Sequence, residues 1–335
     1  MMRKRFIYTA TILVLLLSSC SNDDMEVVPQ PQPQEATRWE CILFGSYPAN
    51  EVVSGSFDAV DSYALVEGDV IVDATLYSQL EQAEWTDDDA EIDGKRYHRI
   101  NAAGAVSHSA NREQHYRWTD AEAWHYFAYA PIKWRILKQT GDKAVLLADR
   151  MPDTCPFNDS YTDTSWSDCF LRRWLNSEFL NRAFTASEIE AIEETEVRNA
   201  PNYYFGTDCG PDTNDRVFVL SESETFSSPL AVEYGFTNSD SGTDPARRFR
   251  STLYAKCRGA WWSPVEKYHG VSFWFMRSIG YTKANVVYVG ESGDTFNRGT
   301  VVTCNDAAVL PAITIDLSKA NYQPAPSVAS TDINN

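Results

Sequence analysis

The feature that most constrains this chain is a succession of short β-forming runs, separated by turns rich in Gly, Asp and Asn. Residues 132–137 alternate apolar and basic side chains, the period-two pattern of a half-buried strand, and the apolar residues 144–148 follow after a Gly-containing turn. This arrangement predicts an antiparallel hairpin. Further β-like runs stand at 216–220, 271–276, 285–289, 299–303 and 309–315. Because strands follow one another through turns instead of alternating with long helices, we expect an α+β fold with short antiparallel sheets and long loops.

One helical stretch interrupts the β pattern. Ser167 is a suitable N-cap residue for it. The apolar side chains behind that cap recur at helical spacing, at Leu171, Trp174, Leu175 and Phe179. Thr185 and Glu188 have the spacing of a capping box, which predicts a second helix, and Ser221 and Glu224 have the same spacing. The sequence therefore predicts two central helices between the hairpin and the later strands.

The N-terminus predicts export and lipid attachment. Three basic residues precede the apolar residues 6–17, a stretch too short to span a bilayer but typical of a secretory signal peptide. It ends in Leu17-Ser18-Ser19-Cys20, which resembles a bacterial lipobox. The resemblance implies that residues 1–19 are removed and that Cys20 is acylated, so the partner is a membrane and the location the outer membrane. The alternative is an ordinary cleaved signal peptide that happens to contain a Cys.

Residues 20–38 are expected to form a tether. Asp23, Asp24 and Glu26 follow Cys20 closely, which resembles the surface-export signal of Bacteroidetes lipoproteins; the alternative is a solvated linker. Prolines interleaved with Gln then favour a stiff, extended segment. We therefore expect the protein at the cell surface.

The composition limits the class of partner and the kind of fold. Lys and Arg number 29 against 47 Asp and Glu, a net charge of −18, which argues against a nucleic-acid partner. A hydrophobic content of 43% supports a large core. Beyond the tether we expect a β-rich N-terminal lobe at 39–130, a core domain at 131–317 and a flexible C-terminal tail at 318–335.

The cysteines suit an exported protein. Apart from Cys20 they are Cys41, Cys155, Cys169, Cys209, Cys257 and Cys304. Their even number permits disulfides, and we expect one or two, although the sequence does not choose the pairs. No C-x-x-C motif occurs, which argues against a zinc knuckle or a thioredoxin-type site.

Several short motifs recur in a fixed order. They are F-G-S-Y-P at 44–48, W-R-I-L at 134–137, L-R-R-W-L-N at 171–176, Y-A-K-x-R-G at 254–259, R-S-x-G at 277–280 and L-P-A at 310–312. The series resembles a bacterial family, domain of unknown function 6273, over about residues 39–317. Its C-terminal part also resembles the C-type-lectin-like fold of sulfatase-modifying-factor proteins, which implies a small twisted sheet and two helices that support recognition loops. Two features differ from the usual pattern of domain of unknown function 6273. Ile279 stands where its members usually have Pro, and residues 261–270 are an insertion relative to them.

Motifs for catalysis are missing. The sequence contains no H-E-x-x-H, G-x-S-x-G, Walker A or Rossmann glycine motif. Glu122-x-x-His125 occurs once, whereas a di-iron site needs it twice. Cys257 and Cys304 lie far apart, unlike the paired copper-binding cysteines of formylglycine-generating oxidases. Residues 238–244 place oxygen ligands at alternate positions, which suits either Ca²⁺ or a plain Asp/Gly turn. We expect no catalytic residue, metal or cofactor.

The remaining candidates are aromatic and polar residues of the C-terminal third. Aromatic faces beside amide and carboxylate groups suit sugars or peptides. The candidate ligand-binding residues are Trp261, Trp262, Tyr268, Arg277, Asn285, Glu291, Asp294 and Asn297. For Arg277 a structural pair with a carboxylate is the alternative role.

These observations favour a surface lipoprotein that binds a glycan or a protein through its C-terminal loops without catalysis. Two alternatives stay open. One is an enzyme, a hydrolase or an oxidase of the sulfatase-modifying-factor type, with a site assembled from distant residues. The other is a structural component of an outer-membrane assembly.

Overall fold

The computed structural model describes residues 36–55, 64–106, 118, 120–239 and 243–332. The predicted signal peptide, Cys20 and most of the predicted tether lie outside these ranges, so lipidation of Cys20 stays a prediction. Among the helices within them, none is both long and apolar enough to cross a membrane.

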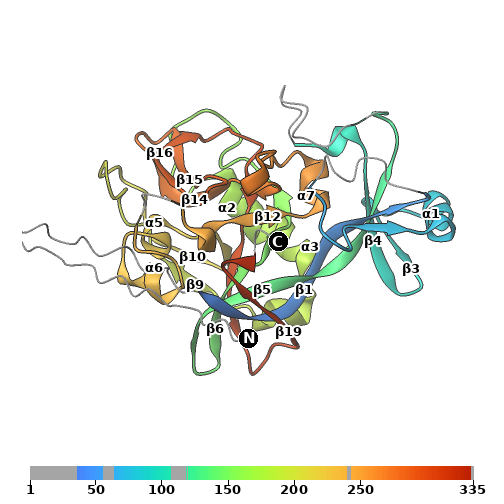
Figure 1. Cartoon of the computed structure of the whole chain (residues 1–335), viewed down its shortest axis with the longest axis horizontal. Coiled ribbons are helices and arrows are strands. Elements are labelled where there is room, and N and C mark those ends of the chain that lie inside the picture. The colour runs from blue at the N-terminus through green and yellow to red at the C-terminus, as the bar shows by residue number, and fades with distance from the viewer. Residues whose placement is uncertain (1–35, 56–63, 107–117, 119, 240–242, 333–335) are drawn as a thin grey trace, which may run out of the picture. The chain divides into compact units, whose positions relative to one another are not determined.

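Two long strands are the central elements of the fold. β1 (Arg38–Val53) and β5 (His125–Thr140) each contain 16 residues and pair antiparallel along most of their length (Figure 1). After the turn at Gly141, the chain returns from β5 as β6 (Lys143–Ala148), antiparallel to it. The predicted hairpin is therefore confirmed.

β1 and β5 lie within the largest sheet, whose main order is β11-β18-β6-β5-β1-β19. At the C-terminal end of β1, β2 pairs with it in parallel. At the N-terminal end of β5, β4 pairs with it antiparallel, and β3 pairs with β4. The bounds of these other strands are Val70–Val72 (β2), Asp89–Ile92 (β3), Lys95–Ile100 (β4), Val217–Phe218 (β11), Ala312–Asp316 (β18) and Gln323–Ala329 (β19).

Smaller sheets complete the β structure. One sheet contains β7 (Arg150–Met151), β12 (Phe249–Ser251) and β13 (Val271–Ser272). Another contains β8 (Asp153–Thr154), β14 (Trp274–Ile279), β15 (Asn285–Val289), β16 (Thr295–Val301) and β17 (Ala308–Val309). A third pairs β9 (Thr195–Val197) with β10 (Thr213–Asp215). Most ladders are antiparallel, with parallel pairs β7–β12 and β14–β17. The predicted α+β class is confirmed.

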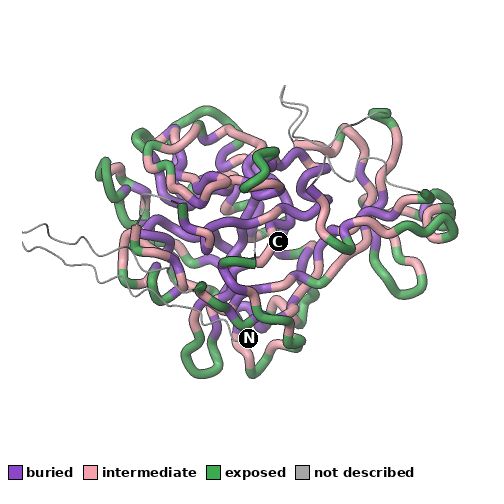
Figure 2. The backbone as a smooth tube through the Cα atoms, viewed as in Figure 1, coloured by how far each residue is buried: buried purple, intermediate pink, exposed green. Residues whose placement is uncertain are grey.

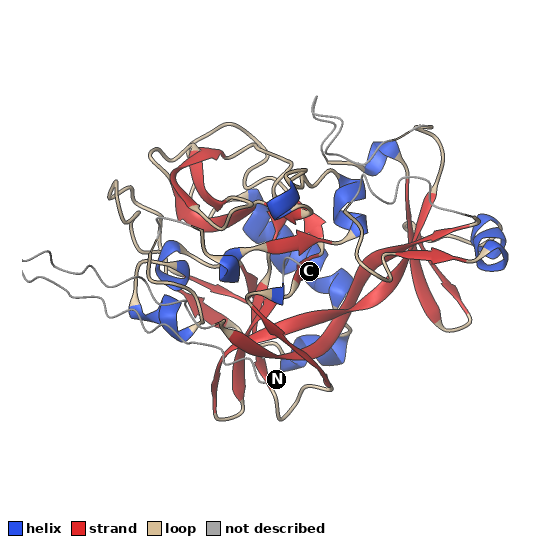
Figure 3. Ribbon diagram, viewed as in Figure 1, coloured by secondary structure: helices blue, strands red, loops and turns tan. Residues whose placement is uncertain are grey.

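The helices are short and lie among the strands (Figure 3). They are α1 (Ala74–Glu81), η2 (Ala102–Gly104), α2 (Phe170–Trp174), η3 (Leu175–Phe179), α3 (Leu180–Ala183), α4 (Ala186–Ala191), α5 (Glu222–Thr225), α6 (Pro229–Glu233), η4 (Pro245–Arg247), α7 (Leu253–Arg258) and η5 (Glu266–Tyr268). Thr185 and Glu188 make the predicted capping box of α4, and Ser221 and Glu224 make that of α5. Both local predictions are confirmed.

The predicted central helix runs through α2, η3 and α3 without a break in the chain. Its N-cap is Cys169, not Ser167, because the Cys169 Sγ accepts the N–H of Arg172 at 3.4 Å. The predicted apolar stripe is buried as expected. The middle segment η3 is π-helical, and the amide of Asn176 donates to the carbonyls of Arg172 (3.0 Å) and Val217 (2.8 Å). Since a π turn changes the face on which later side chains stand, it sets where Glu178 and Arg182 point.

Apolar side chains form a large cluster and a small one. The small cluster, Val52, Leu80, Tyr97 and Tyr126, lies beside α1, where the ring of Trp85 stacks on Tyr126 at 5.5 Å. β1 and β5 contribute buried residues to both clusters, and Figure 2 shows buried and half-buried stretches alternating along the backbone. The two clusters therefore share one rigid strand pair.

Two expected domain limits need correction. The limit expected between residues 130 and 131 falls inside β5, so the N-terminal lobe and the core share one sheet. The tail expected to be flexible contains β19, which pairs antiparallel with β1 from Arg38–Ala329 to Leu43–Gln323. Its prolines, Pro324 and Pro326, lack an N–H but suit the edge strand of a sheet.

Gly45 gives a test of this framework. It lies at a register shift of β1 with φ +68°, and a Cβ there would stand 2.8 Å from the carbonyl oxygen of Ala183 and closer still to the Phe184 ring. We expect Gly45→Ala to lower the free energy of unfolding by about 3 kcal/mol, because overpacking adds to left-handed strain. Gly141→Ala is the matched control, since Gly141 has φ +60° and open space, and should cost only about 1 kcal/mol. Urea unfolding measures both, and equal losses would contradict the close packing of Gly45.

Candidate functional site

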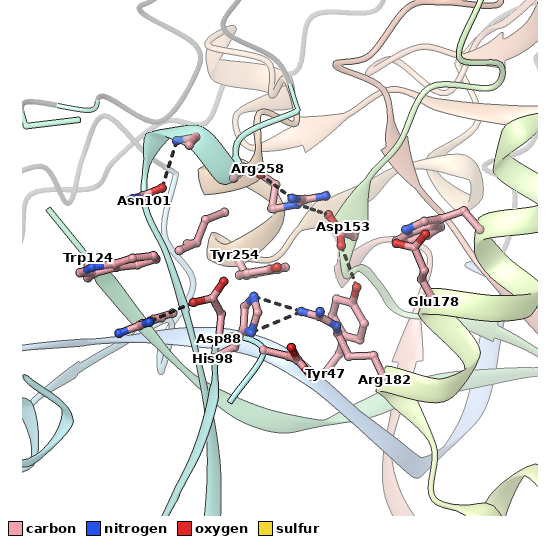
Figure 4. Close-up of a pocket in the computed structure, with 16 residues that line it drawn as sticks. Tyr47, Asp88, His98, Asn101, Trp124, Asp153, Glu178, Arg182, Tyr254 and Arg258 are labelled. Atoms are coloured by element: carbon pink, nitrogen blue, oxygen red, sulfur yellow. Dashed lines mark hydrogen bonds and ion pairs between the residues drawn. The ribbon is translucent and has the colours of Figure 1, made fainter. Parts of the chain in front are cut away.

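A cavity of about 520 Å³ lies where β1, β4, β8, α3 and α7 approach one another (Figure 4). Its lining is rich in charged and hydrogen-bonding side chains. The lining residues are Tyr47, Asp87, Asp88, His98, Arg99, Ile100, Asn101, Ala103, Gly104, Trp124, Asp153, Trp174, Glu178, Arg182, Tyr254 and Arg258.

The carboxylate of Asp153 organises one side of the cavity. Asp153 is 2% exposed, and it accepts hydrogen bonds from the Tyr47 hydroxyl at 2.7 Å and from the Arg258 Nε at 3.2 Å. Burial, together with this carboxylate, holds the pKa of Tyr47 well above its usual range. Burial alone would lower the pKa of Arg258, but Asp153 raises it overall. Tyr47 is therefore a neutral donor and Arg258 a fixed cation.

A second hydrogen-bonded chain joins Asp89, His98 and Arg182. His98 Nδ1 lies 2.7 Å from a carboxylate oxygen of Asp89, and Arg182 Nη1 lies 3.0 Å from His98 Nε2. This pattern places a proton on Nδ1 and leaves Nε2 to accept from Arg182. Burial opposes ionisation of Asp89, but the hydrogen bonds from His98 and Tyr129 keep its pKa below the usual value. Among the described residues, Arg182 has no carboxylate within ion-pair distance.

Tyr254 lies between the hydrogen-bonded group around Asp153 and the one that contains His98. Its ring is 1% exposed and packs edge-to-face against Tyr47 (5.9 Å), His98 (5.7 Å) and Phe127 (5.2 Å). Burial raises the pKa of its hydroxyl, so that group stays protonated. Among the described residues the hydroxyl has no hydrogen-bond partner, although Tyr254 lines the cavity. A hydroxyl without a protein partner at the wall of such a space is free to bind a ligand or water.

The rim combines aromatic rings with charges. The Arg99 guanidinium lies 4.2 Å above the Trp124 ring and pairs with Asp88 at 2.9 Å. Trp174 is largely buried, and Glu178, one turn further along, is exposed. The cavity therefore offers donors, acceptors and aromatic surface together, the chemistry that suits a hydroxyl-rich ligand.

None of the C-terminal candidates lines this cavity. Trp262 and Arg277 are 1% and 2% exposed, and Arg277 pairs with Glu224, so both are part of the interior. The other candidates are half-buried: Trp261, Tyr268, Asn285, Glu291, Asp294 and Asn297. A ligand-binding role for them stays a prediction.

The cavity residues were missed because they come from distant segments. Four of them nevertheless stand in the short motifs noted above: Tyr47 in F-G-S-Y-P, Trp174 in L-R-R-W-L-N, and Tyr254 with Arg258 in Y-A-K-x-R-G. The spacing of Tyr254 and Arg258 is four residues, which places both on one face of α7. That spacing was the available signal.

The prediction for the cysteines needs revision. All six described cysteines are free thiols, so the prediction of one or two disulfides is wrong. Burial raises the pKa of Cys169 to about 12, which keeps that thiol unreactive. Within the described ranges no group of His, Cys, Asp and Glu has the arrangement of a metal site. The possible calcium stretch 238–244 lies partly outside those ranges, and Asp244 instead pairs with Arg247 at 3.1 Å.

The sequence comparison now decides the family. Residues 141–317 match the domain of unknown function DUF6273. The chain belongs to this family. No curated protein and no solved structure matches the chain. The family domain contributes Asp153, Glu178 and Arg182 as well as α7, whereas β1 and β4 contribute cavity residues from outside the matched range.

Asp153 gives a test of the site's construction. We expect Asp153→Asn to lower the free energy of unfolding by about 3 kcal/mol, because it leaves the largely buried Arg258 cation unpaired. The matched control is Asp88→Asn, which breaks a more exposed Asp–Arg pair and should cost less than about 1 kcal/mol. Both values come from urea unfolding at neutral pH. A small loss for both variants would show that Asp153 does not hold the cavity together.

Proposed function

We propose that this protein is a lipid-anchored protein of the outer-membrane surface, whose C-type-lectin-like domain binds a glycan in the cavity around Asp153 and Tyr254. The observation that carries the proposal is at Tyr254: the residue is almost fully buried and lines the cavity, and its hydroxyl has no hydrogen-bond partner among the described residues. The anchor and the location rest on the lipobox-like sequence at Cys20.

The chemistry of the lining favours a glycan over other ligands. Sugar hydroxyls both donate and accept hydrogen bonds, and sugar rings stack on aromatic faces. Arg182 and Tyr254 supply donors, Glu178 supplies an acceptor, and the aromatic side chains of Trp124 and Trp174 supply apolar surface. Because Asp153 and Arg258 neutralise each other, they can orient a ligand without a strong preference for either sign of charge.

Binding can be measured with the purified full-length protein in detergent on an array of neutral and acidic oligosaccharides and peptides. We expect retention of an oligosaccharide, and about tenfold weaker binding for Tyr254→Phe, because that change removes one hydrogen bond and leaves the ring. Tyr161→Phe is the control, since Tyr161 is 67% exposed and lies outside the cavity. The proposal fails if no glycan is retained or if Tyr254→Phe binds like the unchanged protein. Loss of binding in Trp261→Ala instead would place the site in the C-terminal loops.

A hydrolase is the second candidate. The observation that favours it is the presence of two carboxyl groups, Asp153 and Glu178, in one cavity, since glycoside hydrolysis uses such a pair. Incubating the retained oligosaccharide with the protein and measuring new reducing ends distinguishes the two. If the unchanged protein produces new reducing ends and Glu178→Gln does not, the result favours the hydrolase.

A further inference from the structure

A second cavity of about 400 Å³ adjoins the first. Trp174, Glu178 and Arg258 line both spaces, so the two cavities meet at these three side chains. Two of these side chains are held by other contacts, since Trp174 packs on Phe179 at 5.7 Å and Arg258 is paired with Asp153. The third, Glu178, is exposed.

The two cavities differ in chemistry. The first contains Arg182 and the charged rim described above. Apart from the shared Glu178 and Arg258, the second is lined by neutral side chains, among them the half-buried ring of Phe170, and by the exposed Asp159. Neither Phe170 nor Asp159 lines the first cavity, so each reports on the second space alone.

We infer that the two cavities are successive subsites of one groove, and that the ligand is an oligosaccharide which passes over Trp174 from one to the other. The inference rests on the proposed function and names its substrate class. Cavities of about 300–1,000 Å³ hold small organic ligands, so each space can take a sugar ring by itself. Trp174 at the junction supplies the aromatic surface between the rings, and Glu178 and Arg258 reach both subsites. A monosaccharide would leave the second cavity unused.

The test is the dependence of affinity on ligand length. Isothermal titration with the full-length protein in detergent would use mono- to hexasaccharides of β-1,4-linked N-acetylglucosamine, of α-1,4-linked glucose and of the linkage retained on the array. We expect affinity to rise about tenfold when the ligand grows beyond the first subsite, the effect of one added good contact. Phe170→Ala and Asp159→Asn should remove this rise and leave binding of the shortest bound ligand unchanged.

Controls separate this inference from the proposed function. Phe205→Ala changes another partly exposed Phe outside both cavities and should keep the rise with length. Asp159→Asn conserves volume at an exposed position, so it remains informative if Phe170→Ala unfolds. Equal affinity for short and long ligands, or a rise that survives both variants, overturns the two-subsite groove while the proposed function stands. If the unchanged protein binds no glycan, or if Tyr254→Phe binds a glycan like the unchanged protein, the proposed function itself is overturned. A rise with length for peptides but not for sugars overturns the oligosaccharide assignment.

Discussion

A single buried carboxylate ties together the parts of the chain that form the cavity. Asp153 follows β7 closely and accepts hydrogen bonds from a tyrosine of β1 and an arginine of α7, segments about a hundred residues away on either side. A carboxylate removed from water needs such partners, and each partner in turn needs the carboxylate. This mutual requirement fixes the distance between the long strand β1 and the helix α7. The position of Tyr254, on the same helix, follows from it.

Much of the fold could be predicted because its determinants are local. The β5–β6 hairpin follows from a period-two pattern and a turn, and the capping boxes of α4 and α5 follow from two side chains three residues apart. The pairing of β19 with β1 could not be predicted in this way, because it joins the two ends of the described chain through a proline-containing segment that has little apolar content. Its stability comes from the edge that β1 offers, which the sequence of 323–329 does not reveal.

The site escaped prediction for a related physical reason. Each of its residues is ordinary in its own segment, and only the register between β1, β4 and α7 brings them together. Sequence reasoning instead favoured the aromatic residues of the C-terminal third, where Trp262 and Arg277 serve the interior. The family match explains part of this division. Residues 141–317 supply Asp153, the central helix and α7, whereas Tyr47, His98 and Asn101 come from the preceding segment. The cavity is therefore built partly from residues that the family match does not cover.

The placement of β1 has a mechanical consequence. β1 lies between β5 and β19, and the N–H of Ser330 donates to the carbonyl of Thr37 at 2.7 Å, so the start of β1 pairs with β19 and, from Cys41 on, with β5 as well. A tensile load that enters the domain ahead of Thr37 acts along the axis of β1. It must shear two ladders of hydrogen bonds at the same time, whereas a load on an edge strand could peel one ladder bond by bond. The start of β1 is thus a part of the described domain that resists being pulled away from its neighbours.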